Sequence, residues 1–106
     1  MITEQTIMEA VRRIALGFDP ERVILFGSHA RGDASPRSDI DLLVLIDRGD
    51  VANPRVGEMY RAMHGLKAPV DIVVMTVSEF EEYKELVGTV ARPANREGRV
   101  LYRRAG

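Results

Sequence analysis

The chain has 106 residues, of which 45% are hydrophobic and 29% are charged. This length fits one domain with a modest core, and the composition is typical of a folded protein and argues against disorder. Fifteen basic and sixteen acidic residues nearly cancel, which argues against a protein that wraps long duplex nucleic acid. We therefore expect a single domain over residues 1–106.

The residue types present limit the kinds of site that the chain can build. Without cysteine it has no disulfide and no thiolate zinc site, and His29 and His64 are its two histidines. A bound metal must therefore be held mainly by carboxylates. No apolar run approaches the ~20 residues of a membrane span, and the polar, acidic N-terminus does not resemble a signal peptide. We expect a cytoplasmic protein without a membrane partner.

The spacing of apolar residues predicts helices and strands in alternation. Three- and four-residue spacing predicts an amphipathic helix over residues 3–17, ended by Gly17 and Pro20. A loop rich in Gly, Ser, Asp and Pro, with at most one helical turn starting at Ser28, separates the first two strands. Runs of β-branched and aromatic residues predict three strands: 22–26, 40–46 and 70–75.

Two more helices and a short last strand are predicted in the second half of the chain. Asn53 and Pro54 are typical of an N-cap and a first-turn proline. Ser78 and Glu81 form a capping-box pattern ahead of a third helix that ends near Pro93. The second helix has an apolar stripe: Val56, Met59, Tyr60, Met63 and Leu66. With a short strand over 99–102, this order predicts a two-layer α/β fold.

Three aspartates are the candidate metal ligands. Asp39 and Asp41 are two residues apart on a predicted strand, so both carboxylates are expected on one face. Such charges repel unless a cation lies between them, and carboxylate oxygens suit Mg²⁺ or Mn²⁺. Asp71 interrupts an apolar strand, where a buried carboxylate needs a partner. If the two strands are neighbours, the trio can hold two metal ions, and Asp71 can accept a proton from an attacking hydroxyl.

The residues ahead of this acidic pair are candidates for phosphate binding. Gly27 and Ser28 lie where a strand passes into a helical turn, so backbone amides and the Ser28 hydroxyl can meet a polyphosphate. Arg31 is placed to pair with the same phosphates. An anion cradle beside a metal cluster is what nucleotidyl transfer requires.

The motif resembles the polymerase beta-like nucleotidyltransferase superfamily, and within it the minimal nucleotidyltransferases of toxin-antitoxin pairs. The shared signature is Gly-Ser, ten residues, then Asp-x-Asp, here Gly27 and Ser28, residues 29–38, and Asp39 to Asp41. The ending EGRVLY over residues 97–102 also looks like the family. The resemblance implies a mixed sheet of about four strands with helices packed on it, and a third acidic ligand at Asp71.

The resemblance also implies cofactors and a partner. ATP is the expected nucleotide donor, with Mg²⁺ as two ions, and the acceptor is expected to be a tyrosine of a HEPN-domain toxin in a hetero-oligomer with this chain as antitoxin. Two alternatives stay open at this point: a non-catalytic antitoxin that occludes its partner, and nucleotidyl transfer to a small molecule such as an aminoglycoside.

Several residues also have simpler interpretations. Asp71 can be a surface residue at the start of an edge strand, because Pro69 nearby permits an edge. Gly27 can be a turn glycine and Ser28 a helix cap, and Arg31 can be a solvated loop cation. The two histidines are expected to be surface residues.

Overall fold

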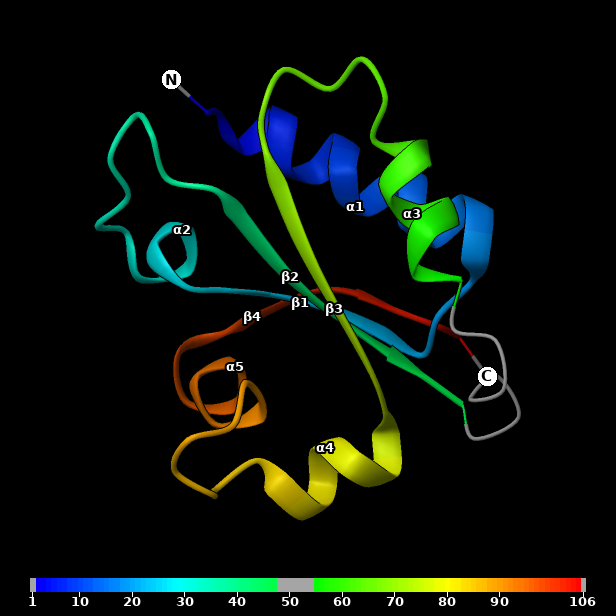
Figure 1. Cartoon of the computed structure of the whole chain (residues 1–106), viewed down its shortest axis with the longest axis vertical. Helices are drawn as coiled ribbons and strands as arrows, with labels where there is room; N and C mark the ends of the chain where they lie inside the picture. Colours follow the sequence, from blue (N-terminus) through cyan, green and yellow to red (C-terminus); the bar gives the residue numbers. More distant parts are fainter. Residues whose placement is uncertain (1, 48–54, 106) are drawn as a thin grey trace.

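Four strands form one sheet with helices on both of its faces in the computed structural model, which describes residues 2–47 and 55–105 (Figure 1). The strands predicted over 22–26 and 40–46 are confirmed to the residue, and the third and last strands each extend one residue further than predicted. The described elements are α1 (Glu4–Phe18), β1 (Arg22–Phe26), α2 (Ser28–Arg31), β2 (Ile40–Ile46), α3 (Val56–Ala62), β3 (Val70–Thr76), α4 (Val77–Tyr83), α5 (Ala91–Glu97) and β4 (Arg99–Arg103).

The sheet is mixed, in the order β3-β2-β1-β4. Strand β1 pairs antiparallel with β2 and with β4, whereas β2 and β3 are parallel. The starts of β2 and β3 and the end of β1 therefore meet at the same end of the sheet. The predicted α/β class with a four-stranded mixed sheet is confirmed.

Strand β2 is covered on both of its faces, which explains its nearly continuous apolar sequence. Leu42 and Val44 pack in the core formed with α1 and α3, while Leu43 and Leu45 pack in a second core with Phe80 of α4 and residues of α5. The expectation of two layers was thus incomplete. The chain after β3 folds back over the second face and adds a third layer (Figure 1).

The first helix carries its predicted core face, with Ile7, Val11 and Ile14 buried. It continues through Gly17 to Phe18, and Asp19 closes it in the left-handed conformation, with its N–H donating to the carbonyl of Ala15. Gly17 therefore does not end the helix as predicted.

The second predicted helix is shorter than its apolar stripe. Asn53 and Pro54 lie outside the described residues, so their capping roles stay predictions. Met59 and Met63 are buried as expected. Tyr60 is 41% exposed and does not belong to the core, and Leu66 lies beyond the end of the helix.

The third predicted helix is divided into two short ones. The capping box is formed by Thr76 and Glu79. Helix α4 ends at Tyr83. In the turns that follow, Gly88 adopts a positive φ and the hydroxyl of Thr89 donates to the carbonyls of Tyr83 and Leu86. The capping box therefore lies two residues ahead of the one predicted at Ser78. Pro93 does not end a helix but lies in the first turn of α5, where helical N–H groups lack partners.

Replacing Thr76 with Val is expected to destabilise the fold by about 1 kcal/mol, the usual effect of losing an N-cap side chain. The Thr76 hydroxyl accepts from the backbone N–H of Glu79 at 3.0 Å, and valine keeps the shape of the buried side chain without this acceptor. The matched control is Ser78→Ala, which removes the cap predicted from the sequence. Urea unfolding should separate the two variants, and equal destabilisation would contradict the capping assignment.

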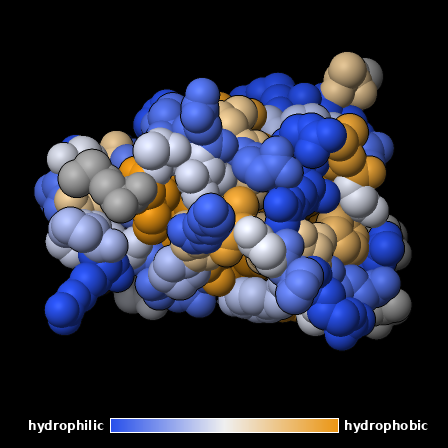
Figure 2. All heavy atoms as spheres, turned by 90° about the horizontal axis from the view of Figure 1, so that it is seen from above, coloured by the Kyte–Doolittle hydropathy of each residue, from blue (hydrophilic) through white to orange (hydrophobic). Residues whose placement is uncertain are grey.

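The surface toward the viewer in Figure 2, which is the upper end of Figure 1, is largely polar, with apolar residues in small separated patches. Within residues 2–47 and 55–105, the structure has no helix of the length and apolar character needed to cross a membrane.

Candidate active site

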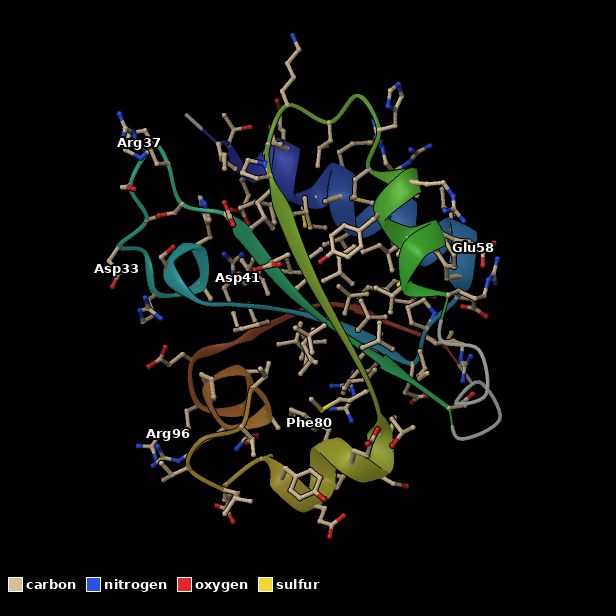
Figure 3. All side chains as sticks on the ribbon, viewed as in Figure 1. Asp33, Arg37, Asp41, Glu58, Phe80 and Arg96 are labelled. Atoms are coloured by element: carbon tan, nitrogen blue, oxygen red, sulfur yellow. The ribbon has the colours of Figure 1, made fainter. Side chains whose placement is uncertain are left out.

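Asp41 and Asp71 lie side by side on adjacent parallel strands. They are direct partners in the register of β2 and β3, so their side chains leave the same face of the sheet. It is the face that α4 and α5 cover, because Leu43 and Val73, each two residues further along, pack in that core. Figure 3 shows Asp41 between α2 and β3. The structure thus brings these two predicted ligands together.

Asp39 is exposed and lies one residue ahead of β2. It remains electrostatically close to the pair: the pKa of Asp41 is raised, first by its burial and then by the negative charges of Asp71 and Asp39. His29 and Arg31 act on this pKa in the opposite direction and more weakly. The three aspartates therefore form one region of negative charge around the half-buried Asp41.

Gly27 is packed against the carboxylate of Asp41. Its φ of 75° and ψ of −158° lie in a region that is essentially restricted to glycine. A Cβ placed on Gly27 would collide with Oδ2 of Asp41 and lie 3.1 Å from its Cγ. The glycine is thus more than a turn residue, because the close approach of backbone and carboxylate depends on it.

Helix α2 starts at Ser28, directly beside this contact, and consists of one turn as predicted. The N–H groups of Ala30 and Arg31 donate to the carbonyl of Gly27, whereas no described residue accepts from the N–H of Ser28 or His29. These two amides are available to a bound anion.

Arg31 is held by two carboxylates. Its Nε donates to Asp33 at 3.1 Å and its Nη1 donates to Glu97 of α5 at 3.2 Å. The hydrogen bond to Asp33 and, to a lesser extent, the one to Glu97 raise the pKa of Arg31 above its ordinary value. In the described part of the chain nothing accepts from Nη2, so one edge of the guanidinium stays open to a phosphate.

The expectation that Asp71 is buried was wrong. Its side chain is exposed, because β3 is an edge strand and Asp71 is its second residue. The simpler interpretation, a surface position on an edge strand, describes its environment correctly. The same position nevertheless places it next to Asp41, since the register of β3 on β2 determines that contact.

His29 has a structural contact that the sequence did not indicate. It is half-buried, and its Nε2 donates at 3.1 Å to the carbonyl of Ser38, the residue before Asp39. The histidine thereby ties α2 to the start of the acidic motif across the loop. Its spacing in the motif suggests no such role, because the bond depends on how the loop folds back. His64 is exposed as expected.

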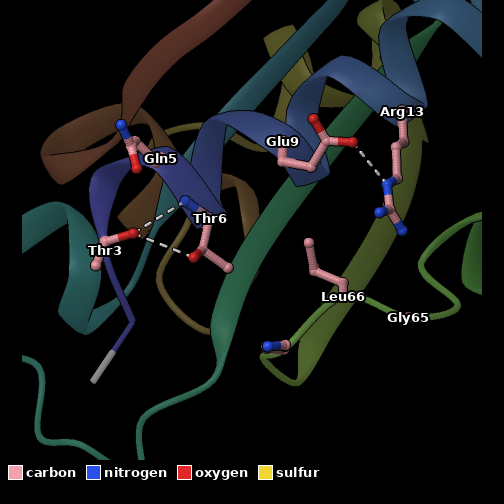
Figure 4. Close-up of a pocket in the computed structure, with 8 residues that line it drawn as sticks. Thr3, Gln5, Thr6, Glu9, Arg13, Gly65 and Leu66 are labelled. Atoms are coloured by element: carbon pink, nitrogen blue, oxygen red, sulfur yellow. Dashed lines mark hydrogen bonds and ion pairs between the residues drawn. The ribbon is translucent and has the colours of Figure 1, made fainter.

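An open groove of about 320 Å³ lies elsewhere, between the first half of α1 and the turn before β3 (Figure 4). Its walls include Thr6, Glu9 and Arg13 of α1 and Leu66 across from them. Helix α1 and Leu66 pack on the core opposite the face from which Asp41 and Asp71 project. The groove is therefore separate from the acidic site.

The acidic site has the donors that a divalent cation requires. Its carboxylate oxygens suit Mg²⁺ or Mn²⁺, and a cation would relieve the repulsion that, together with burial as the larger cause, raises the pKa of Asp41. Among the described residues, no three acidic or histidine side chains are already gathered as a complete ligand set. The residues fit a metal site in type and charge, with Asp41 and Asp71 paired and Asp39 beside them.

Comparison with known proteins identifies the family. The model of the nucleotidyltransferase domain family matches residues 5–101. The chain belongs to this family. The matched region includes Gly27, Asp39, Asp41 and Asp71 of this nucleotidyltransferase domain.

Two archaeal proteins of Methanocaldococcus jannaschii are similar in sequence to this nucleotidyltransferase. Both are provisionally named protein adenylyltransferases. One is 37% identical over 84 residues, which cover 77% of this chain and 78% of the relative. The other is 62% identical over 26 residues, which cover 24% of this chain and 26% of the relative.

A solved structure has the same fold. A provisionally assigned nucleotidyltransferase from Sulfolobus solfataricus is 27% identical and superimposes with a TM-score of 0.65, covering 94% of this chain and 79% of that one. The polymerase beta-like nucleotidyltransferase fold expected from the sequence is thereby confirmed, and the protein is a nucleotidyltransferase enzyme.

Proposed function

We propose that this nucleotidyltransferase transfers AMP from ATP to a hydroxyl group of a partner protein, with Mg²⁺ or Mn²⁺ bound by Asp39, Asp41 and Asp71. The observation that carries the proposal is the juxtaposition of Asp41 with Asp71 in register and with the backbone of Gly27 at the start of α2. Acid cluster and anion-binding amides meet at one corner of the sheet. Transfer of a nucleotidyl group needs both.

Each residue of the site has a role in this reaction. The amides of Ser28 and His29, the Ser28 hydroxyl and the open edge of Arg31 bind the β- and γ-phosphates and orient the α-phosphorus. Divalent metal, when bound by the three aspartates, neutralises the charge that develops on the phosphate oxygens. The acceptor oxygen forms a bond to the α-phosphorus, the bond to the β-phosphate breaks, and pyrophosphate leaves. Asp71, the most exposed strand carboxylate of the site, accepts the proton of the acceptor hydroxyl.

The proposed acceptor is a tyrosine of a HEPN-domain toxin, which makes this chain an antitoxin. Two observations support a protein acceptor: the names of the archaeal relatives, and the resemblance of the Gly27 to Asp41 motif to minimal nucleotidyltransferases. The exposed position of Asp71 on an edge strand leaves the proposed base open to an acceptor as large as a protein.

The direct test is to incubate the pure chain with the protein encoded beside it, divalent metal and ATP labelled on its α-phosphate. Label should appear on a tyrosine of that protein, while ATP labelled on the γ-phosphate should leave it unlabelled. Absence of label on the partner protein after incubation with α-labelled ATP would count against the proposal. Label on a small molecule in an acceptor screen would redirect it to the small-molecule alternative.

The variants Asp39→Asn and Asp41→Asn distinguish catalytic neutralisation of the partner from the competing hypothesis, neutralisation by occlusion. Catalytic neutralisation predicts that both variants still bind the partner in a pull-down assay but fail to protect cells from it. Full protection by both variants would favour occlusion, because the complex would then suffice without nucleotide transfer.

A further inference from the structure

The hydroxyl group of Tyr60 lies against the start of β3, next to Asp71. The backbone N–H of Ile72 donates to this hydroxyl at 2.8 Å. The hydroxyl is in turn 3.5 Å from Oδ1 of Asp71 and 3.4 Å from the carbonyl of Ile72, both of which can accept its hydrogen. One side chain from α3 thus contacts both the backbone beside Asp71 and the Asp71 carboxylate.

The start of β3 benefits from such a contact, because among the described strands β3 has a pairing partner on one side only. Strand β3 is at the edge of the sheet and pairs with β2. The Ile72 N–H lies at the outer edge, and Tyr60 gives it an acceptor. On the inner side, the charges of Asp41 and Asp71 repel each other at the same register position. This repulsion favours separation of the strands where the metal site requires them to stay together.

Tyr60 is anchored by the packing of its helix, α3, against the sheet. Its neighbours Met59 and Met63 are buried in the core between α3 and the sheet, with 2% and 9% exposure. Tyr60 itself is partly exposed, and its hydroxyl reaches the backbone N–H of Ile72. Its burial alone does not explain a tyrosine here, whereas its hydroxyl has three polar neighbours.

We propose that Tyr60 is a positioning residue for Asp71, which holds the start of β3 so that the Asp71 carboxylate stays beside Asp41 before a cation binds. This inference rests on the proposed function, in which Asp71 is a metal ligand. Tyr60 acts through Asp71 and does not touch the reacting atoms. Its removal should therefore weaken metal binding and leave the metal-saturated reaction nearly intact.

The test compares Tyr60→Phe with the matched control Tyr83→Phe, whose hydroxyl has no partner among the described side chains. The first readout is hydrogen exchange of the Ile72 amide followed by NMR. The second is binding of Mn²⁺ alone, measured by electron paramagnetic resonance. The third is label transfer as a function of Mg²⁺ concentration.

We expect Tyr60→Phe to accelerate exchange at Ile72 and to weaken Mn²⁺ binding, each by roughly 2- to 10-fold, the factor that corresponds to one net hydrogen bond. The Mg²⁺ concentration for half-maximal transfer should rise by the same factor, with the maximal rate within about 2-fold of the wild type. Tyr83→Phe should match the wild type in all three readouts. In an Asp71→Asn background, Tyr60→Phe should have no further effect on Mn²⁺ binding, because the two residues act as one unit.

Unchanged Mn²⁺ affinity together with faster exchange at Ile72 would overturn the inference, since Tyr60 would then support only the strand. Additive effects of Tyr60→Phe and Asp71→Asn would overturn it as well. These outcomes are distinct from failure of the proposed function, which would appear as absence of label transfer in the wild type. Hydrogen exchange and Mn²⁺ binding are measured without turnover, so they test the role of Tyr60 independently of label transfer.

Discussion

Replacing Asp41 with Asn is expected to lower the rate of nucleotidyl transfer by at least about 10²- to 10³-fold, the scale seen when one group that stabilises transition-state charge is removed. Asp41 is the centre of the site: it pairs with Asp71, contacts Gly27 and follows Asp39 in the motif. Asparagine keeps the shape of the side chain and removes its charge. The measurement is α-label transfer at saturating ATP and metal, and a rate within about 10-fold of the wild type would contradict the central role of Asp41.

The same substitution should make the metal-free protein more stable at neutral pH. Burial and the charges of Asp71 and Asp39 raise the pKa of Asp41 in the folded state above its unfolded value. The folded state therefore disfavours the ionised carboxylate, and stability present at low pH is lost as pH rises through the raised pKa. Asparagine at this position does not ionise, so the variant does not lose this stability as pH rises. Function and stability are thus expected to change in opposite directions.

Urea unfolding across a pH series with chelator tests this expectation. The difference between wild type and Asp41→Asn should be small near pH 4 and should increase in favour of the variant toward pH 7. Comparing the two proteins isolates Asp41 from Glu9 and Glu81, whose pKa values are lowered by hydrogen bonds to Arg13 and Lys84. A wild type that is more stable than the variant at pH 7 without metal would contradict the assignment.

Gly27→Ala is the second substitution with a large expected effect. The backbone of Gly27 lies in a region that costs other residues about 1–3 kcal/mol, and the new Cβ would collide with Oδ2 of Asp41. We expect destabilisation of at least this size, together with loss of nucleotide transfer, because relief of the collision displaces either the Asp41 carboxylate or the start of α2. Thermal unfolding and the α-label assay measure the two effects.

The matched control is Gly17→Ala. Gly17 lies within α1, has no positive φ, and has open space around its Cβ position. Alanine there should be neutral or stabilising by up to about 1 kcal/mol, as expected for a helical position. If Gly27→Ala resembles Gly17→Ala in stability and retains transfer, the close approach of Gly27 to Asp41 has no functional importance.

The strands could be predicted from the sequence because each is a short β-branched run with clear ends. Gly27 terminates β1, and β2 begins directly after Asp39. The layers were harder to predict. Every residue of β2 except Asp41 is buried, which is compatible with one or two covered faces until the position of α4 and α5 is known.

Helix ends depended on side-chain contacts that spacing does not reveal. Both Thr76 with Glu79 and Ser78 with Glu81 fit a capping box in sequence, and the structure uses the first. After α4, the hydroxyl of Thr89 donates to the carbonyls of Tyr83 and Leu86, and these contacts depend on the fold of residues 84–90.

The candidate site was predicted as a set of residues, but its supporting contacts were not. Local spacing related Gly27 to Asp41, and the alternation of strands and helices suggested where Asp71 belongs. The partner strand of β3, the bond from His29 to Ser38 and the reach of Tyr60 to Ile72 all join distant segments. Contacts between such segments follow from the tertiary fold, and no local pattern encodes them.

The most direct measurement is a crystal of the wild-type chain soaked with Mn²⁺ and a non-hydrolysable ATP analogue, with an anomalous difference map to locate the metal. We predict Mn²⁺ peaks in contact with Asp41 and Asp71, and the β- and γ-phosphates at the amides of Ser28 and His29. Mn²⁺ bound at other residues, with the phosphates away from the Gly27 corner, would contradict it.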